Sequence, residues 1–145
     1  MRIFSLDLHK KYMPGRGRKR RIIAPPRFGG YKPYGCAKNN EAPIQLLYEE
    51  YEAIKLADYK LMNHQEAAIL MGISRATFAR IYEKARRKIA QALVETKEIQ
   101  TINGNSYSNN NWMICCDCHA RFTLPKSDQN EECPLCNSKQ IETLI

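Results

Sequence analysis

The sequence predicts a mainly α-helical fold: a three-helix core of the helix-turn-helix type, with a basic N-terminal arm and a small C-terminal β module. Three observations predict it. Residues 41–97 hold stretches of helical periodicity on both sides of a glycine. Residues 1–40 are rich in Arg, Pro and Gly, and residues 112–145 contain two Cys-x2-Cys pairs. The predicted domains are therefore 1–40, 41–105 and 112–145.

Composition limits the classes of protein. A chain of 145 residues suits one ordinary domain or two very small ones. The net charge of +8 favours polyanionic partners, nucleic acid before an anionic membrane. No segment approaches the ~18 apolar residues of a spanning helix, and the N-terminus MRIFSLDLHKK lacks the apolar core of a signal peptide. We therefore expect a cytoplasmic protein with reduced cysteines and no membrane partner.

Residues 1–40 form the predicted basic arm, with eleven Lys/Arg and one acid. Pro14, Gly15 and Gly17 disfavour a helix there, and neighbouring cations repel one another, so we predict a largely irregular segment. Its Arg side chains are suited either to a narrow DNA minor groove or to non-specific attraction to phosphates. The cations of this cluster are Arg16, Arg18, Lys19, Arg20 and Arg21.

The first helix of the core is predicted from Gln45 to Asp58, because Leu47, Tyr51 and Ile54 recur at helical spacing. Three acids lie close together within it. No nucleophile, histidine or Gly-rich loop accompanies them, so we interpret them as a solvated face rather than as acid–base catalysts. These acids are Glu49, Glu50 and Glu52.

The second helix is predicted from His64 to Met71. Asn63 and Glu66 have the spacing of a capping box at its start. Gly72 follows, where the chain reverses and a residue without Cβ is favoured. We expect a seam of small or apolar side chains where this helix crosses the next one: Ala67, Ala68, Met71, Ile73, Phe78 and Ile81.

The third helix is predicted from an N-cap at Ser74 to about Thr96. Its apolar stripe comprises Phe78, Ile81, Tyr82, Ala85, Ile89, Ala92 and Leu93. The part from Ile89 to Thr96 is long enough to serve a homodimer, although packing within the monomer explains the same residues. A short strand over 98–102 and a linker over 106–111 are expected to follow.

The turn and the basic helix after it have the layout of a helix-turn-helix, in which the second helix enters the DNA major groove. An αα-hairpin that packs a small bundle is the structural alternative. Arg75 and Arg80 are the predicted base contacts, since Arg pairs with guanine O6 and N7. Ser74, Ala76 and Ala79 project from the same outward side of the helix start and are expected to lie close to the bases. Phosphate contacts are predicted for Lys84, Arg86, Arg87 and Lys88.

The stretch EEYEAIKLADYKLMNHQEAAILMGISRATFARIYEKARRKIAQALVETKEI closely resembles an uncharacterised bacterial and archaeal family of predicted DNA-binding proteins. Their helix-turn-helix is similar to region 4 of RNA polymerase sigma factors. The resemblance covers roughly residues 13–105 and includes the Arg/Pro-rich MPGRGRKRRIIAPPRFGGYKPYG. It implies a DNA-binding fold and a regulatory role, without an established target. Such proteins usually begin near Met13, so residues 1–12 are expected to reflect an upstream start.

The C-terminal module is predicted to be zinc-ribbon-like. Cys115 and Cys118, with Cys133 and Cys136 fourteen residues further on, supply four thiolates at the spacing of a tetrahedral Zn²⁺ site. The same ligand set holds iron. Cys116 or His119 is the alternative to Cys115 or Cys118 as a ligand. The apolar floor of the ribbon is expected to consist of Phe122, Leu124, Ile141 and Leu144.

Together these features predict a sequence-specific double-stranded DNA-binding protein, a transcriptional regulator that reads the major groove with the helix starting at Ser74. Four thiolates leave no open metal position for a catalytic water, so no enzyme is expected. The alternative is an interaction adaptor with only non-specific nucleic-acid binding. Residues 98–145 sum to a charge of −3, which suits docking of this module on RNA polymerase or another protein.

Overall fold

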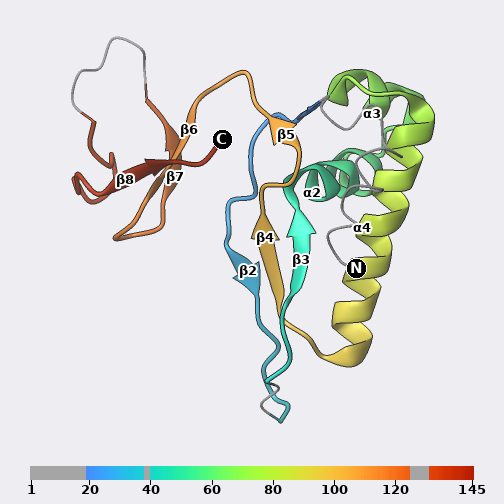
Figure 1. Ribbon diagram of the computed structural model, residues 1–145, viewed down its shortest axis with the longest axis horizontal. Helices are drawn as coiled ribbons and strands as arrows, with labels where there is room; N and C mark the ends of the chain where they lie inside the picture. Colours follow the sequence, from blue (N-terminus) through green and yellow to red (C-terminus); the bar gives the residue numbers. More distant parts are fainter. Residues whose placement is uncertain (1–18, 38–39, 125–130) are drawn as a thin grey trace, which may run out of the picture.

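The computed structural model describes residues 19–37, 40–124 and 131–145 (Figure 1). Of these residues, 34% are helical and 20% lie in strands that form three small sheets. The fold is therefore α/β, and the prediction of a mainly α-helical chain was wrong. The missing contribution is a set of short strands whose partners are distant in the sequence.

The helical region contains α2 (Tyr48–Ile54), which continues as the π-helical segment η2 (Lys55–Tyr59), then α3 (His64–Met71) and α4 (Arg75–Glu95). The predicted bounds of the last two helices are confirmed. The Asn63 side chain accepts from the Glu66 N–H, and the Glu66 carboxylate accepts from the Asn63 N–H. Ser74 caps α4 through the Thr77 N–H. These local signals placed both helix starts correctly.

The strands that precede and follow this region in the chain belong to a three-stranded sheet. It has the order β2 (Gly30–Tyr31), β4 (Ile99–Ile102), β3 (Ile44–Leu47), with β2 antiparallel and β3 parallel to β4. The prediction that a helix begins at Gln45 was wrong for this reason: the residues before Tyr48 pair with β4 instead. All helices in the described residues thus lie in the crossover between two adjacent parallel strands.

A two-stranded parallel sheet joins β1 (Arg20–Arg21) to β5 (Ser106–Tyr107). Part of the arm predicted to be irregular and part of the predicted linker therefore pair with each other. We call residues 20–31 the strap, because they run from β1 near α3 down to β2 beside β4 (Figure 1). Arg16 and Arg18 lie outside the described residues.

The C-terminal module is a three-stranded antiparallel sheet. Its strands are β6 (Trp112–Cys115), β7 (Arg121–Thr123) and β8 (Ile141–Thr143), in the order β7-β6-β8. Its buried residues are Cys115, Phe122 and Cys133, with Leu124 and Ile141 packed against them. Three of the four predicted floor residues are thus in place, and Leu144 lies outside this cluster.

The main core lies between the helices. Its buried residues are Ala53, Leu56, Ala67, Ala68, Met71 and Phe78, against which Ile73, Ile81 and Tyr82 pack. The predicted seam between the second and third helices is therefore confirmed. Leu93 departs from the predicted stripe, since 76% of it is exposed. No helix in the described part of the chain is long and apolar enough to cross a membrane.

Candidate nucleic-acid interface and metal centre

The turn between α3 and α4 has the geometry that its glycine predicts. Gly72 has φ +67°, in the left-handed region where a side chain is strained. Its N–H donates to Ile69 O at 3.1 Å, and the Ile73 N–H donates to Ala68 O at 3.0 Å. These bonds end α3 and direct the chain into the Ser74 cap of α4. The angle between the two helices is thereby fixed by backbone contacts.

The start of α4 presents the predicted base-contacting residues on the surface. Ser74, Arg75, Ala76 and Arg80 are exposed, and Ala79 is half-buried. Arg75 has no hydrogen-bond or ion-pair partner among the described residues, whereas Arg80 donates to Thr77 Oγ1 at 3.3 Å. This end of α4 therefore combines a free guanidinium with small neighbouring side chains.

The cations further along α4 differ in their surroundings. Arg87 pairs with Glu83 at 2.9 Å, one helical turn away, and both side chains are exposed. Arg86 lies over the Tyr82 ring and 4.0 Å from Asp58. Lys84 is exposed and has no ion-pair partner in the described ranges. Three of the four predicted phosphate contacts are accordingly open to a polyanion.

Lys88, the fourth, has a structural position. Its ammonium group donates to Glu50 Oε1 and to Gln45 O, both at 2.8 Å. The side chain is only 28% exposed, and its carboxylate partner is 2% exposed. Lys88 thus ties α4 to the beginning of α2 and to β3.

The acids at the start of α2 are buried, so their interpretation as a solvated face was wrong. Besides its bond with Lys88, Glu50 accepts from the Leu47 N–H. Glu49 accepts from the Asn105 N–H at 2.9 Å, and Glu52 accepts from the Ile23 N–H and pairs with Lys55. Sequence reasoning missed them because every partner except Leu47 and Lys55 is more than 25 residues away.

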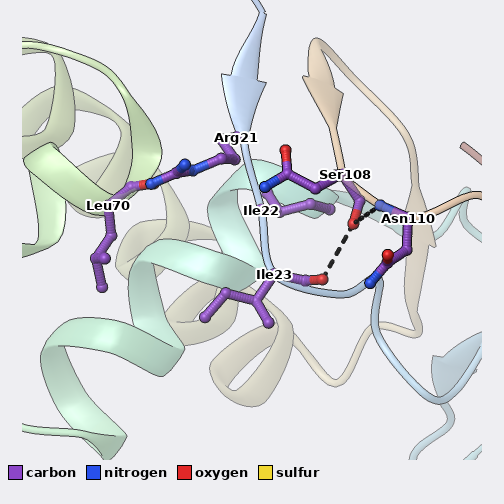
Figure 2. A pocket seen from close by; sticks show the side chains of 7 residues that line it. Arg21, Ile22, Ile23, Leu70, Ser108 and Asn110 are labelled. Carbon is purple, nitrogen blue, oxygen red and sulfur yellow. Dashed lines mark hydrogen bonds between the residues drawn. The ribbon is translucent and has the colours of Figure 1, made fainter.

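The described cations of the arm lie close to the end of α3. The Arg21 guanidinium donates through Nε to Leu70 O at 2.7 Å, as Figure 2 shows. Arg20 is half-buried, and Lys19 is exposed. Arg21, Leu70 and Ser108 also line a cavity of about 190 Å³, together with Ile22, Ile23, Asn109 and Asn110. The Arg21 guanidinium is therefore already hydrogen-bonded to a backbone carbonyl of the protein itself.

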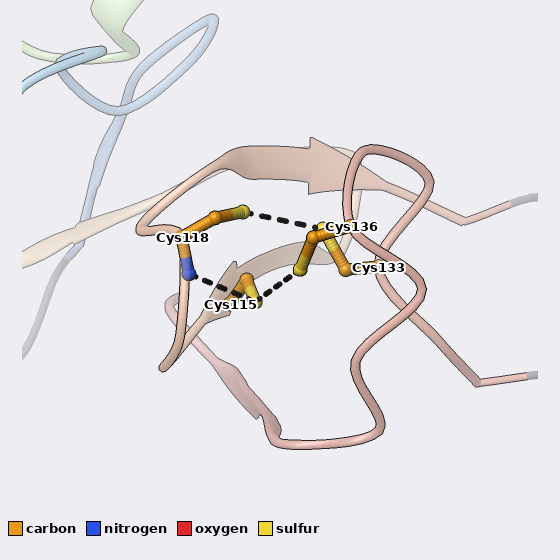
Figure 3. A group of neighbouring side chains, drawn as sticks. All are labelled: Cys115, Cys118, Cys133 and Cys136. Atoms are coloured by element: carbon orange, nitrogen blue, oxygen red, sulfur yellow. Dashed lines mark hydrogen bonds between the residues drawn. The ribbon is translucent and has the colours of Figure 1, made fainter.

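Four cysteines converge in the C-terminal module (Figure 3). The sulfur atoms of Cys115, Cys118, Cys133 and Cys136 all lie within 4.8 Å of one another. Cys115 Sγ is 3.6 Å from Cys136 Sγ, and Cys118 Sγ is 3.5 Å from Cys133 Sγ. None of them forms a disulfide. The predicted ligand set is thus brought together, and it could hold a metal ion.

The two cysteine knuckles have matching backbone geometry. His119 and Asn137, each directly after the second cysteine, have φ +63° and +61°. Their N–H groups donate to Cys115 O at 2.9 Å and to Cys133 O at 2.8 Å. His119 is therefore part of a turn, and neither it nor the exposed Cys116 belongs to the four-sulfur group.

Backbone amides favour thiolate at this centre. The Cys118 N–H donates to Cys115 Sγ and, with smaller contributions from neighbouring groups, lowers the pKa of the Cys115 thiol to about 6. The Leu135 N–H lies in the same way 3.4 Å from Cys133 Sγ. A thiolate is the form of cysteine that binds metal. At Cys118 and Cys136 the backbone hydrogen bonds act in the same direction, but burial and the neighbouring sulfurs outweigh them and raise the pKa of both thiols, so the amides favour thiolate most at Cys115.

Comparison with known proteins gives a family. Residues 11–110 match the family model described as "Protein of unknown function DUF134". A "UPF0251 protein" of Chloroherpeton thalassium is 36% identical over 132 residues, which cover 91% of this chain and 87% of the relative. One from Methanothermobacter thermautotrophicus is 36% identical over 91% of this chain and 68% of its own length. One from Caldicellulosiruptor bescii is 39% identical, covering 89% and 87%. No solved structure matches.

Proposed function

This chain belongs to the DUF134 family of uncharacterised bacterial and archaeal proteins, and we propose that it is a sequence-specific double-stranded DNA-binding protein that regulates transcription. The observation that carries the proposal is the exposed start of α4. It follows a tight glycine turn, carries the unpaired Arg75, and is braced from behind by the buried Phe78. A helix presented in this way is suited to enter a major groove with its first turns.

Two kinds of contact would contribute to binding. Arg75 and Arg80 would donate to guanine O6 and N7, and each well-formed pair is worth roughly 1–3 kcal/mol of discrimination. Lys84, Arg86 and Arg87 would neutralise phosphates, which orients the protein but carries no sequence information. Lys88 is not needed in this scheme, because Glu50 already holds it.

Selection of duplexes from a random pool by the metal-loaded protein tests the proposal. We expect one enriched motif at about 0.15 M salt, and its loss when Arg75 and Arg80 are both replaced by Ala. Lys32 and Lys139, which are exposed and lie outside the helix-turn-helix, provide a control with the same change in charge. Lys32→Ala/Lys139→Ala should keep the motif. Equal losses in both double variants would contradict base reading by α4.

We propose Zn²⁺ as the metal of the four-cysteine centre. Four sulfurs at Zn–S ≈ 2.3 Å lie roughly 3.8 Å apart on a tetrahedron, close to the 3.6 Å between Cys115 and Cys136 and the 3.5 Å between Cys118 and Cys133. A closed Cys₄ site supplies folding energy and no open position for catalysis. Elemental analysis of protein purified without added metal tests the assignment, and one iron per chain in place of zinc would overturn it.

The charge of −3 on residues 98–145 favours a second candidate function, an adaptor that docks on RNA polymerase or another protein through the cysteine module. The duplex selection separates the two functions, because an adaptor would yield weak, steeply salt-dependent binding and no enriched motif.

A further inference from the structure

The cysteine module contacts the rest of the protein through Arg121 of β7. Its Nη1 donates to Pro26 O of the strap at 2.5 Å. The same guanidinium is a hydrogen-bond partner of Tyr48, the first residue of α2, which is 3% exposed. Pro26 is also fully buried. Both partners are thus interior groups that lack water as a substitute for Arg121.

The position of Arg121 depends directly on the metal-binding knuckle. The Cys115 N–H donates to Ala120 O at 2.9 Å, and Arg121 faces Ile114 across the β6–β7 pair. A module of about 35 residues with so few buried side chains cannot fold on apolar burial alone. Metal bound by the four cysteines would therefore keep Arg121 in place.

The strap continues from Pro26 to the helix-turn-helix. The Ile23 N–H donates to Glu52 Oε2 at 3.3 Å, Ile22 is 1% exposed, and Arg21 donates to Leu70 O. Leu70 is two residues before Gly72, at the end of α3 (Figure 2). One continuous segment of six residues, 21–26, thus connects the Arg121 contact to the turn that positions α4.

We propose that metal occupancy of the four-cysteine centre controls how firmly the strap is held against α2 and α3, with Arg121 as the residue that transmits the effect. Loss of the metal unfolds the module and withdraws Arg121 from two buried partners. The strap then loosens, and Arg21 no longer ties the end of α3. Metal occupancy thereby regulates DNA binding. The coupling between the metal and the strap stands without DNA, and only its effect on DNA binding rests on the proposed function.

Hydrogen–deuterium exchange of the full chain without DNA tests the coupling. In the native sequence, removal of the metal by a chelator should accelerate exchange within residues 112–145 and also within residues 20–31, the latter by roughly tenfold, the factor expected for one charge-assisted hydrogen bond. In Arg121→Gln the strap should exchange fast with or without metal. Lys139→Gln, an exposed change in the same module, should behave like the native chain.

Several outcomes would overturn the coupling. It fails if metal removal leaves exchange of residues 20–31 unchanged in the native chain, or if Arg121→Gln responds to metal as the native chain does. Because Arg121→Gln could fold poorly, Arg121→Lys provides a second variant. It keeps one donor, and it should retain one metal per chain and an intermediate strap response. If metal removal accelerates exchange of the strap in Arg121→Lys as much as in the native chain, the effect comes from the fold and not from this guanidinium.

DNA binding supplies a separate readout. Metal removal should weaken duplex binding by the native chain, and should change it little in Arg121→Gln. Absence of duplex binding in every form would refute the proposed function, while the exchange pattern would still decide the coupling. Failure of the two proposals is thereby distinguishable.

Discussion

The three buried glutamates of α2 each connect this helix to a different part of the chain. Glu49 binds the backbone before β5, Glu50 binds Lys88 of α4, and Glu52 binds the strap at Ile23. A buried carboxylate is costly unless it is paired and hydrogen-bonded. These residues therefore act as a common anchor within the first five residues of one short helix.

We predict that Glu50→Gln destabilises the protein by about 3 kcal/mol, because it leaves the ammonium of Lys88 without its carboxylate in a largely buried position. The free energy of unfolding is measured by denaturant titration. Glu83→Gln is the matched control, since it removes an exposed i, i+4 pair with Arg87. That change should cost less than about 0.5 kcal/mol. Equal effects of the two variants would contradict a structural role for the buried pair.

At the scale of elements, the strap has little regular structure and contacts several parts of the fold. It pairs with β5 at one end and with β4 at the other, and Thr101 Oγ1 donates to Phe28 O at 3.0 Å between them. Gly30 is needed for close pairing, because a Cβ there would overlap the Ile99 carbonyl oxygen. A Cβ on the neighbouring Gly29 would meet no atom within 4 Å.

These neighbouring glycines give a paired prediction. Gly30→Ala should destabilise the protein by roughly 1–3 kcal/mol, the usual cost of forcing atoms into a packed site. Gly29→Ala should be neutral or stabilise by up to about 1 kcal/mol through the unfolded chain. Thermal unfolding of the two variants checks the difference. A Gly30→Ala protein as stable as Gly29→Ala would show that the strap does not pair with β4 in solution.

The elements that the sequence predicts correctly are those defined by residues close together in the chain. The Asn63–Glu66 capping box, Gly72 and Ser74 specify α3 and α4 within a few positions, and the Cys-x2-Cys spacing specifies the knuckles. The strand expected over 98–102 is confirmed as β4, whereas β1, β2, β3 and β5 escaped prediction because each is two to four residues long and pairs at a distance. Ile44 pairs with Ile99, and Arg20 pairs with Ser106. The short apolar segment after Pro43 is the signal that could have indicated β3.

Distance along the chain also limited how much of the candidate site could be predicted from the sequence. Surface residues of α4 were identified from helical periodicity alone, which needs no tertiary information. The roles of Lys88 and Arg21 depend on partners contributed by other elements, Glu50 and Leu70. Periodicity marks the outward side of a helix, but it does not show which outward cation meets a neighbouring element.

For the whole molecule, of formal net charge +8, the proposed binding to DNA should weaken as the salt concentration rises. Each phosphate that the protein neutralises adds about −0.9 to the slope of log K against log salt. We expect Lys84→Gln/Arg87→Gln to reduce the magnitude of this slope by about 1.8 while the preferred sequence stays the same. Fluorescence anisotropy over a range of salt concentrations measures it. An altered preferred sequence would place these side chains at base edges instead.

The pairing of β3 with β4 has a consequence for how the helical region can be exchanged. Because β3 and β4 are parallel, the chain leaves the sheet after Leu47, which faces Ile102, and returns to it at Ile99, which faces Ile44. Residues 48–98 therefore run from one end of this strand pair back to the other, and a strand holds each of their ends. Under the proposed function, a relative's residues 48–98 transplanted between the same two strands should carry that relative's DNA preference, which makes the region a unit for recombination.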